Sequence, residues 1–124
     1  DTMETFYGDM RNIKSQKIKV FEDFDKWLKE HCKGRPVFVS DNPAFDFFWV
    51  SYYFHHFLGY NPFGWSGRRI SDYFAGLTGN FWDSRRWKKW RKTPHTHQPV
   101  DDAMGNVEAF KYIEQHKDEI RNCN

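Results

Sequence analysis

Only two short segments of this 124-residue chain have the composition of β-strands. Residues Val37–Ser40, "VFVS", form an apolar, β-branched run between turn residues, which is typical of a buried strand. "RRIS", at 68–71, predicts a second short strand. Helical patterns surround both segments, and this alternation is typical of an α/β fold. Two strands make too small a sheet for such a fold, so we expect the missing strands outside the chain.

The spacing of apolar residues predicts helices around the two strands. Ser15–His31 is amphipathic, and Gly34 and Pro36 should end it. Segment 44–59, "AFDFFWVSYYFHHFLG", carries aromatic residues on nearly every face, so we expect it to be largely buried. Segments 72–77, "DYFAGL", and 79–92, "GNFWDSRRWKKWRK", predict two further helices. The last helix, 99–120, should present an apolar stripe made of Ala103, Val107, Phe110, Ile113 and Ile120.

Composition narrows the functional classes without identifying one. Aromatic residues make up 20% of the chain, which predicts a core packed from rings and leaves room for a homodimer face. The net charge of +2 means that anion binding must come from local clusters of cations. Two cysteines without zinc spacing fit a reducing compartment, and no apolar run approaches the roughly 18 residues of a membrane span. No signal peptide is visible. We expect a cytoplasmic protein without membrane contact.

An acidic residue lies one turn into the helix that follows the first strand. Asp46 is flanked by Phe45, Phe47 and Phe48, and a carboxylate among rings is costly unless it is paired or binds a cation. Open α/β sheets bind ligands just beyond the carboxyl ends of their strands, where Asp46 is expected. A structural role fits equally well, because a first-turn acid stabilises a helix through its dipole.

A histidine and two acids precede the last helix, in "HTHQPVDDA". His97 and Asp102 have the spacing His-x4-Asp, and a neutral imidazole can act as a general base. Asp101 and Asp102 can also serve only as first-turn acids of the helix. His95 and His97 form an HxH pair, but we do not expect a zinc site, because no third ligand stands at zinc spacing.

The segment Arg85–Lys92, "RRWKKWRK", combines six cations with two tryptophans. A polynucleotide is attracted to such charges, and its bases can stack on aromatic rings. The alternative is a helix whose tryptophans lie in the core and whose cations lie in water. We favour the core for Trp87 and Trp90, and both readings stay open for the cations.

These candidate residues fall in three separated blocks of the sequence: "VSDNPAFDFFWVSYYF", "NPFGWSGRRISDYFAGL" and "KTPHTHQPVDDAMGNVEA". With them the chain resembles the DEDDh 3′–5′ exonucleases of the ribonuclease H-like superfamily, and more narrowly the short mycobacterial-type 3′–5′ exoribonuclease family. The resemblance covers about Pro36–Phe110. It implies an α/β, ribonuclease H-like exonuclease fold and removal of nucleotides from the 3′ end of single-stranded RNA or short oligonucleotides.

The resemblance also implies residue roles. It assigns Asp46, in the "NxxFD" block, and Asp102, in the "HxxxxD" block, to a site for two divalent cations, Mg²⁺ or Mn²⁺, and His97 to the general base. Carboxylate oxygens suit such hard cations. Two cations about 4 Å apart can activate water and stabilise a developing oxyanion.

Four residues of the same blocks are expected to bind the substrate strand. Arg68 and Arg69 are expected at phosphates, although Arg69 can instead pair with Asp72. Phe45 is placed to pack against a terminal base. Asn42 is expected to cap the following helix, as Asp41 also can, and to touch the nucleotide.

The chain departs from the family at the first acidic motif, an Asp-x-Glu on an early strand. Nothing upstream of Asp46 matches it, since Asp1 and Glu4 have the wrong spacing and no strand-like run around them. We therefore expect one domain, residues 1–124, that lacks its N-terminal strands and alone binds cations poorly. Two functions stay open: an exonuclease in the complete domain, and an incomplete exonuclease-fold module that binds nucleic acid or a protein partner.

Overall fold

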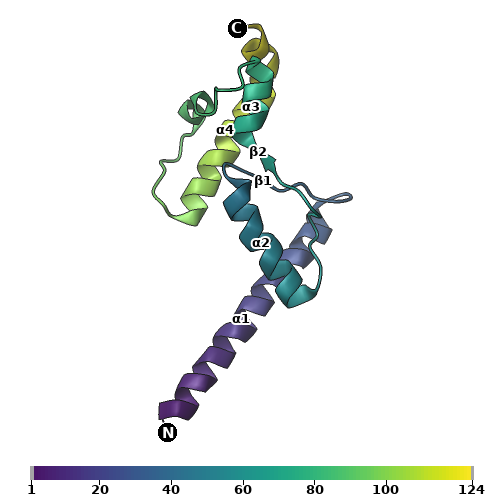
Figure 1. Ribbon diagram of the computed structural model, residues 1–124, viewed down its shortest axis with the longest axis vertical. Helices are drawn as coiled ribbons and strands as arrows, with labels where there is room; N and C mark the ends of the chain where they lie inside the picture. Colours follow the sequence, from purple (N-terminus) through teal and green to yellow (C-terminus); the bar gives the residue numbers. More distant parts are fainter. Residues whose placement is uncertain (1, 124) are drawn as a thin grey trace. The chain divides into compact units, whose positions relative to one another are not determined.

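The computed structural model describes the backbone of residues 2–123 and the side chains of residues 15–123 (Figure 1). The elements, in chain order, are helix α1, strand β1, helix α2, strand β2, helix α3, a 3₁₀ helix (η1) and helix α4. They form two compact units. One holds the residues up to Val37 together with Phe47–Ser66, and the other holds Phe38–Asp46 together with the residues from Gly67 onward.

The first unit is built from α1 (Thr2–His31) and most of α2 (Pro43–Leu58). The ring of Phe21 lies edge-on to Phe54, with ring centroids 5.0 Å apart, and Phe24 packs on Phe54 and Phe63. Leu28, on the same stripe of α1, is buried. The predicted amphipathic face of α1 is therefore confirmed in part, since Val20 and Trp27, at the same apolar spacing, are 62% and 51% exposed. The helix begins at Thr2, thirteen residues before the predicted start (15 − 2 = 13), and Glu4 lies within it rather than on a strand.

The predicted burial of α2 is wrong. Phe54 is its one fully buried residue, whereas Phe45, Phe48, Trp49 and Tyr52 are 43–62% exposed. Among the described side chains, Phe21 of α1 packs on Tyr53, Phe54 and Phe57 of this helix. The aromatic surplus therefore lies on the surface of α2, and a homodimer face there stays a prediction.

The two predicted strands exist and pair in parallel, but they are short. β1 (Val39–Ser40) and β2 (Arg68–Arg69) align Val39 with Arg68 and Ser40 with Arg69. Val37, expected in the buried strand, is 62% exposed, because no further strand covers β1 within the described residues. The mixed α/β class is confirmed, with helix far exceeding strand. A ribonuclease H-like sheet stays a prediction.

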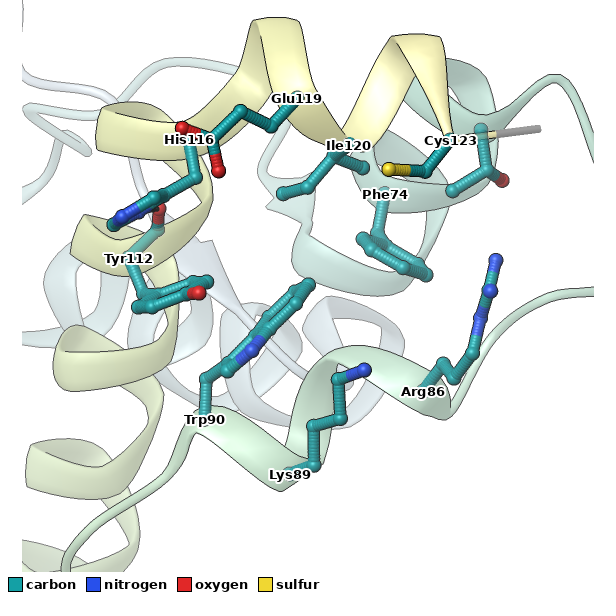
Figure 2. A pocket seen from close by; sticks show the side chains of 10 residues that line it. Phe74, Arg86, Lys89, Trp90, Tyr112, His116, Glu119, Ile120 and Cys123 are labelled. Atoms are coloured by element: carbon teal, nitrogen blue, oxygen red, sulfur yellow. Dashed lines mark hydrogen bonds between the residues drawn. The ribbon is translucent and has the colours of Figure 1, made fainter.

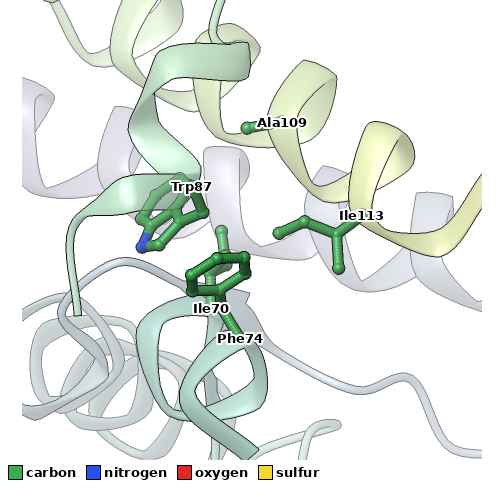
Figure 3. Packing of buried hydrophobic residues seen from close by; sticks show 5 residues of the cluster. All are labelled: Ile70, Phe74, Trp87, Ala109 and Ile113. Atoms are coloured by element: carbon green, nitrogen blue, oxygen red, sulfur yellow. The ribbon is translucent and has the colours of Figure 1, made fainter. Parts of the chain in front are cut away.

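The core of the second unit lies between α3 (Ile70–Thr78), η1 (Arg86–Trp90) and α4 (Pro99–Asn122). Figure 3 shows its five members packed together: Ile70, Phe74, Trp87, Ala109 and Ile113. Trp87 is fully buried, and its indole Nε1–H donates to Ser71 Oγ at 3.0 Å. Burial of the largest aromatic side chain fixes η1 against α3 and α4.

The helix predicted over 79–92 is wrong apart from the five residues of η1. Gly79 takes a left-handed conformation (φ 70°) that ends α3. The Asn80 side-chain oxygen then accepts the Trp82 N–H, and its carbonyl accepts the Asp83 N–H. Asparagine favours turns for this reason, since its side chain competes with helical hydrogen bonds.

The last predicted helix is confirmed, and so is the part of its apolar stripe made of Phe110, Ile113 and Ile120, which lie in or against the core; Ala103 and Val107 do not. α4 buries Gly105, Ala109 and Ile113, whereas Val107 is 46% exposed and Ala103 is also exposed. The cause is close approach at Gly105, where an added Cβ would lie 2.6 Å from Arg91 Nε. No helix in the described part of the chain is long and apolar enough to cross a membrane.

Candidate active site

Three side chains with metal-binding atoms gather where the loop before α4 meets the start of the helix. The ligand atoms of His95, His97 and Asp102 all lie within 4.8 Å of one another. His95 Nδ1 is 2.9 Å from Asp102 Oδ1, and the two imidazole rings have centroids 4.4 Å apart. Both histidines are exposed and Asp102 is half-buried, so a molecule from solvent can reach all three.

Thr96, between the two histidines, attaches this loop to α4. Its backbone N–H donates to Asp102 Oδ1 (3.2 Å), and its hydroxyl donates to Asp101 Oδ2 (2.7 Å). The two adjacent acids thus hold the loop as well as complementing the helix dipole. His97 takes a left-handed backbone conformation, φ 62°, which non-glycine residues adopt at a cost and usually under constraint from their surroundings.

A second attachment holds the loop at Lys92 and Thr93, before the two histidines. The Glu108 carboxylate accepts the backbone N–H groups of Lys92 and Thr93 and the Thr93 hydroxyl, each at 2.8 Å. These donors, with Thr93 contributing most, lower the pKa of Glu108 below its ordinary value. Hydrogen bonds to the ionised form favour that form.

The Glu108 attachment is expected to titrate. Because its folded pKa lies below the ordinary value of 4.5, the attachment is complete above that value and is lost as the pH falls through the folded pKa. The amide proton resonances of Lys92 and Thr93 should therefore move upfield together, with a midpoint below pH 4.5. Glu108→Gln should remove the titration from both amides. A midpoint at or above 4.5 would contradict the assignment.

Asp46, the other predicted metal ligand, lies on α2 rather than at the start of α4. It is exposed in the first turn of α2, where its backbone N–H donates to the carbonyl of Asn42 at 2.9 Å. Among the side chains from Ser15 to Cys123, the group of three potential metal ligands does not include it. Asn42 precedes α2 and is exposed, and Phe45 is 62% exposed. The metal role of Asp46 and the substrate roles of Asn42 and Phe45 stay predictions.

The two arginines predicted at phosphates form β2 and are both exposed. Arg69 donates from Nε to the Asp41 carbonyl (2.9 Å) and lies 3.7 Å from Asp72, which confirms the predicted alternative pairing. It also lines an open cavity of about 560 Å³ with Phe81 and Trp82. Those two rings are 81% and 84% exposed.

The basic-aromatic segment is mostly engaged within the protein. Trp87 is buried, and Trp90 stacks on Tyr112 with ring centroids 4.5 Å apart, which confirms the core placement of both tryptophans. Among its cations, Lys88 lies 2.8 Å from Asp41 Oδ2, and Arg91 Nη2 donates to the Asp102 carbonyl at 3.2 Å. Nucleic-acid contact by the segment stays a prediction.

A cavity of about 200 Å³ lies between η1, α3 and the C-terminal half of α4 (Figure 2). Trp90, Tyr112 and His116 form a stacked column along it, and Arg86 and Lys89 contribute its cations. Arg86 pairs with Asp83 (Nε–Oδ2 2.7 Å), and the Lys89 ammonium lies over the Trp90 ring. These cations are therefore partnered before any ligand binds.

The donor set decides which ion the described residues suit. Two hard cations require several oxygen ligands, and the chain offers the carboxylates of Asp46 and Asp102. Their oxygen atoms are the type of ligand that such ions bind, but two carboxylates are too few to hold both ions. The two imidazoles beside Asp102 instead suit a softer divalent metal.

Sequence reasoning missed His95, Phe81 and Trp82. The sequence offers His95 no third ligand at zinc spacing, although Asp102, seven residues on, completes the group in the structure. Phe81 and Trp82 were assigned to a helix, and the only signal against it was the Gly-Asn pair before them. Cys32 and Cys123 are unpaired, as predicted.

Comparison with known proteins adds a functional likeness. The chain is 32% identical over 105 residues to a protein described as "3′-5′ DNA exonuclease Cap18" from Escherichia coli. The alignment covers 79% of this chain and 56% of the relative, so the chain spans little more than half of that protein's length. No family model matches the chain. The sequence is therefore similar, over most of its own length, to an exonuclease that acts in the 3′–5′ direction.

Proposed function

We propose that the protein is a metal-dependent 3′–5′ exonuclease to which this chain contributes Asp46, His97 and Asp102. The observation that carries the proposal is the position of His97 beside Asp102, at the N-terminus of α4 and open to solvent. The likeness to an exonuclease supports the same reaction class.

We assign metal binding and proton transfer to different residues. The carboxylates of Asp46 and Asp102 would hold two divalent cations, together with oxygen ligands from the rest of the protein. When bound, such cations supply an activated water and stabilise the developing oxyanion. His97 would accept the proton of that water, since an imidazole nitrogen can act as a general base. Thr96 and Glu108 hold the loop that carries this imidazole.

The proposed substrate is the 3′ end of single-stranded DNA. The relative's name specifies DNA, whereas the family resemblance in the sequence favoured RNA. Phe81 and Trp82 provide exposed rings beside Arg69. Such a pairing suits a base stacked above a phosphate contact, and stacking tolerates either sugar. Asn42, Phe45 and Arg68 remain the further substrate contacts that we propose.

The test uses the full-length natural protein, stripped of metal by a chelator, and 5′-labelled single-stranded DNA and RNA of one sequence. Added Mg²⁺ or Mn²⁺ should yield a ladder that shortens from the 3′ end, and a 3′-terminal phosphorothioate should block it. Faster shortening of RNA than of DNA would reverse the proposed sugar preference. Strand binding without shortening would replace the enzyme by a nucleic-acid-binding module.

A further inference from the structure

We propose that His95, His97 and Asp102 form a binding site for one transition-metal ion, of which Zn²⁺ is the representative, distinct from the pair of hard cations. The site does not depend on Asp46. Its consequence for activity rests on the proposed function, because two of its three ligands are the residues assigned above to hydrolysis.

The geometry already brings the ligands near one another. All three ligand atoms lie within 4.8 Å, and zinc–nitrogen bonds of 2.0–2.1 Å place two tetrahedral ligands about 3.3 Å apart. Both histidine side chains are exposed, so rotation of the imidazoles can close the remaining distance without moving the backbone. The closest pair of ligand atoms, His95 Nδ1 and Asp102 Oδ1, is 2.9 Å apart, so an ion bound by both would have to widen this pair only slightly.

The backbone fixes the two histidines in advance. Thr96 donates through both its N–H and its hydroxyl to the acids of α4, and the Gln98 N–H donates to the Thr96 hydroxyl at 3.2 Å. The left-handed conformation of His97, φ 62°, places its ring 4.4 Å from that of His95. A ligand set held in this way loses less conformational entropy when the ion binds.

The ligand chemistry selects the ion. Two imidazoles and one carboxylate bind divalent first-row metals with an affinity that rises to a maximum at Cu²⁺ and is lower again for Zn²⁺. Mg²⁺, in contrast, prefers oxygen ligands. The positive charge of Arg91, whose Nη2 lies 3.9 Å from Asp102 Oδ1, disfavours a bound cation. The negative charge of Asp101, adjacent to Asp102 in the sequence, offsets it. Three protein ligands leave a fourth position of zinc for water.

A functional consequence follows for the hydrolytic site. Zinc bound here occupies the imidazole of His97 and an oxygen of Asp102, so it competes with the hard cations and with proton transfer. The ion would therefore act as an inhibitor, and His95 is the residue that makes this inhibition possible.

Binding is tested on the 124-residue chain by calorimetric titration with Zn²⁺ and by NMR of the histidine rings. Zinc should bind one to one and shift the imidazole resonances of His95 and His97, leaving those of His55 and His116 in place. His95→Ala should weaken binding at least about tenfold, since loss of even an outer-shell partner costs 10–100-fold in affinity. His55→Ala, at an exposed histidine outside the group, is the matched control. Absence of zinc binding, equal binding by His95→Ala, or shifts confined to other histidines would overturn the site.

The inhibition is tested separately in the full-length protein. The ratio of Mg²⁺-dependent activity with and without micromolar Zn²⁺ is compared within each variant, so that changes in basal activity cancel. The ratio should fall in the natural protein and stay near one in His95→Ala. Zinc binding without any nuclease activity would defeat the proposed function and leave the metal site standing. Activity that zinc inhibits equally in both proteins would defeat the inhibitory role of the site.

Discussion

Asp102→Asn is expected to lower Mg²⁺-dependent exonuclease activity of the full-length protein by at least about two orders of magnitude. The substitution keeps the shape of the side chain and removes the negative charge that a hard cation requires. A metal centre contributes several kcal/mol of transition-state stabilisation, and roughly 1.4 kcal/mol corresponds to tenfold in rate. The measurement is the initial rate of shortening of a 5′-labelled strand at saturating Mg²⁺.

Asp101→Asn is the matched control for this experiment. Asp101 and Asp102 are adjacent acids in the first turn of α4, and each accepts a hydrogen bond from Thr96. If the two acids serve only the helix dipole and the loop, the two substitutions should have similar, small effects on activity. If Asp102 holds a cation, only its replacement should abolish activity. Equal effects of the two variants would refute the catalytic assignment of Asp102.

The regular elements of the chain were predictable because their signals are local. The apolar stripe of α1, the turn residues Gly34 and Pro36, and the "DNP" start of α2 depend on near neighbours, and the structure follows them. The burial of α2 was not predictable in this way. Periodicity shows where rings such as Phe48 and Trp49 lie on a helix, but not whether another element covers them.

The segment 79–92 shows how a local signal can mislead. Its cations and tryptophans are spaced as in a helix, yet Trp87 is its one buried residue. Hydrogen bonds accepted by Asn80 and the left-handed Gly79 favour a turn, and the packing of one indole between α3 and α4 offsets the lost helical bonds. Tertiary contacts of this kind routinely override helix propensity.

The candidate site was half predictable for a related reason. The resemblance in the "HxxxxD" block singled out His97 and Asp102, and the structure places both in one group of potential ligands. The contact between His95 and Asp102 depends on the positive φ of His97, which no residue type in "HTHQPV" requires. His95 could therefore not be joined to the group from sequence alone.

Trp87→Ala is expected to destabilise the second unit by about 3–5 kcal/mol, the range for large aromatic residues truncated in a core. The indole is fully buried among Phe74, Ile113 and their neighbours, and its N–H also bonds Ser71 Oγ. Truncation leaves both a cavity and a buried hydroxyl with one partner fewer. Urea unfolding followed by circular dichroism measures the loss, and Trp82→Ala, at a ring that is 84% exposed, should shift the free energy of unfolding by less than about 0.5 kcal/mol.

Trp87→Phe keeps the experiment informative if the alanine variant does not fold. Phenylalanine retains much of the buried volume but lacks the N–H donor, so a smaller loss of about 1–3 kcal/mol is expected. The indole N–H is also one contact of a short hydrogen-bond chain, because Ser71 Oγ, which accepts from it, donates to Asp41 Oδ1 at 3.4 Å. A free energy of unfolding unchanged in both variants would mean that η1 does not pack between α3 and α4.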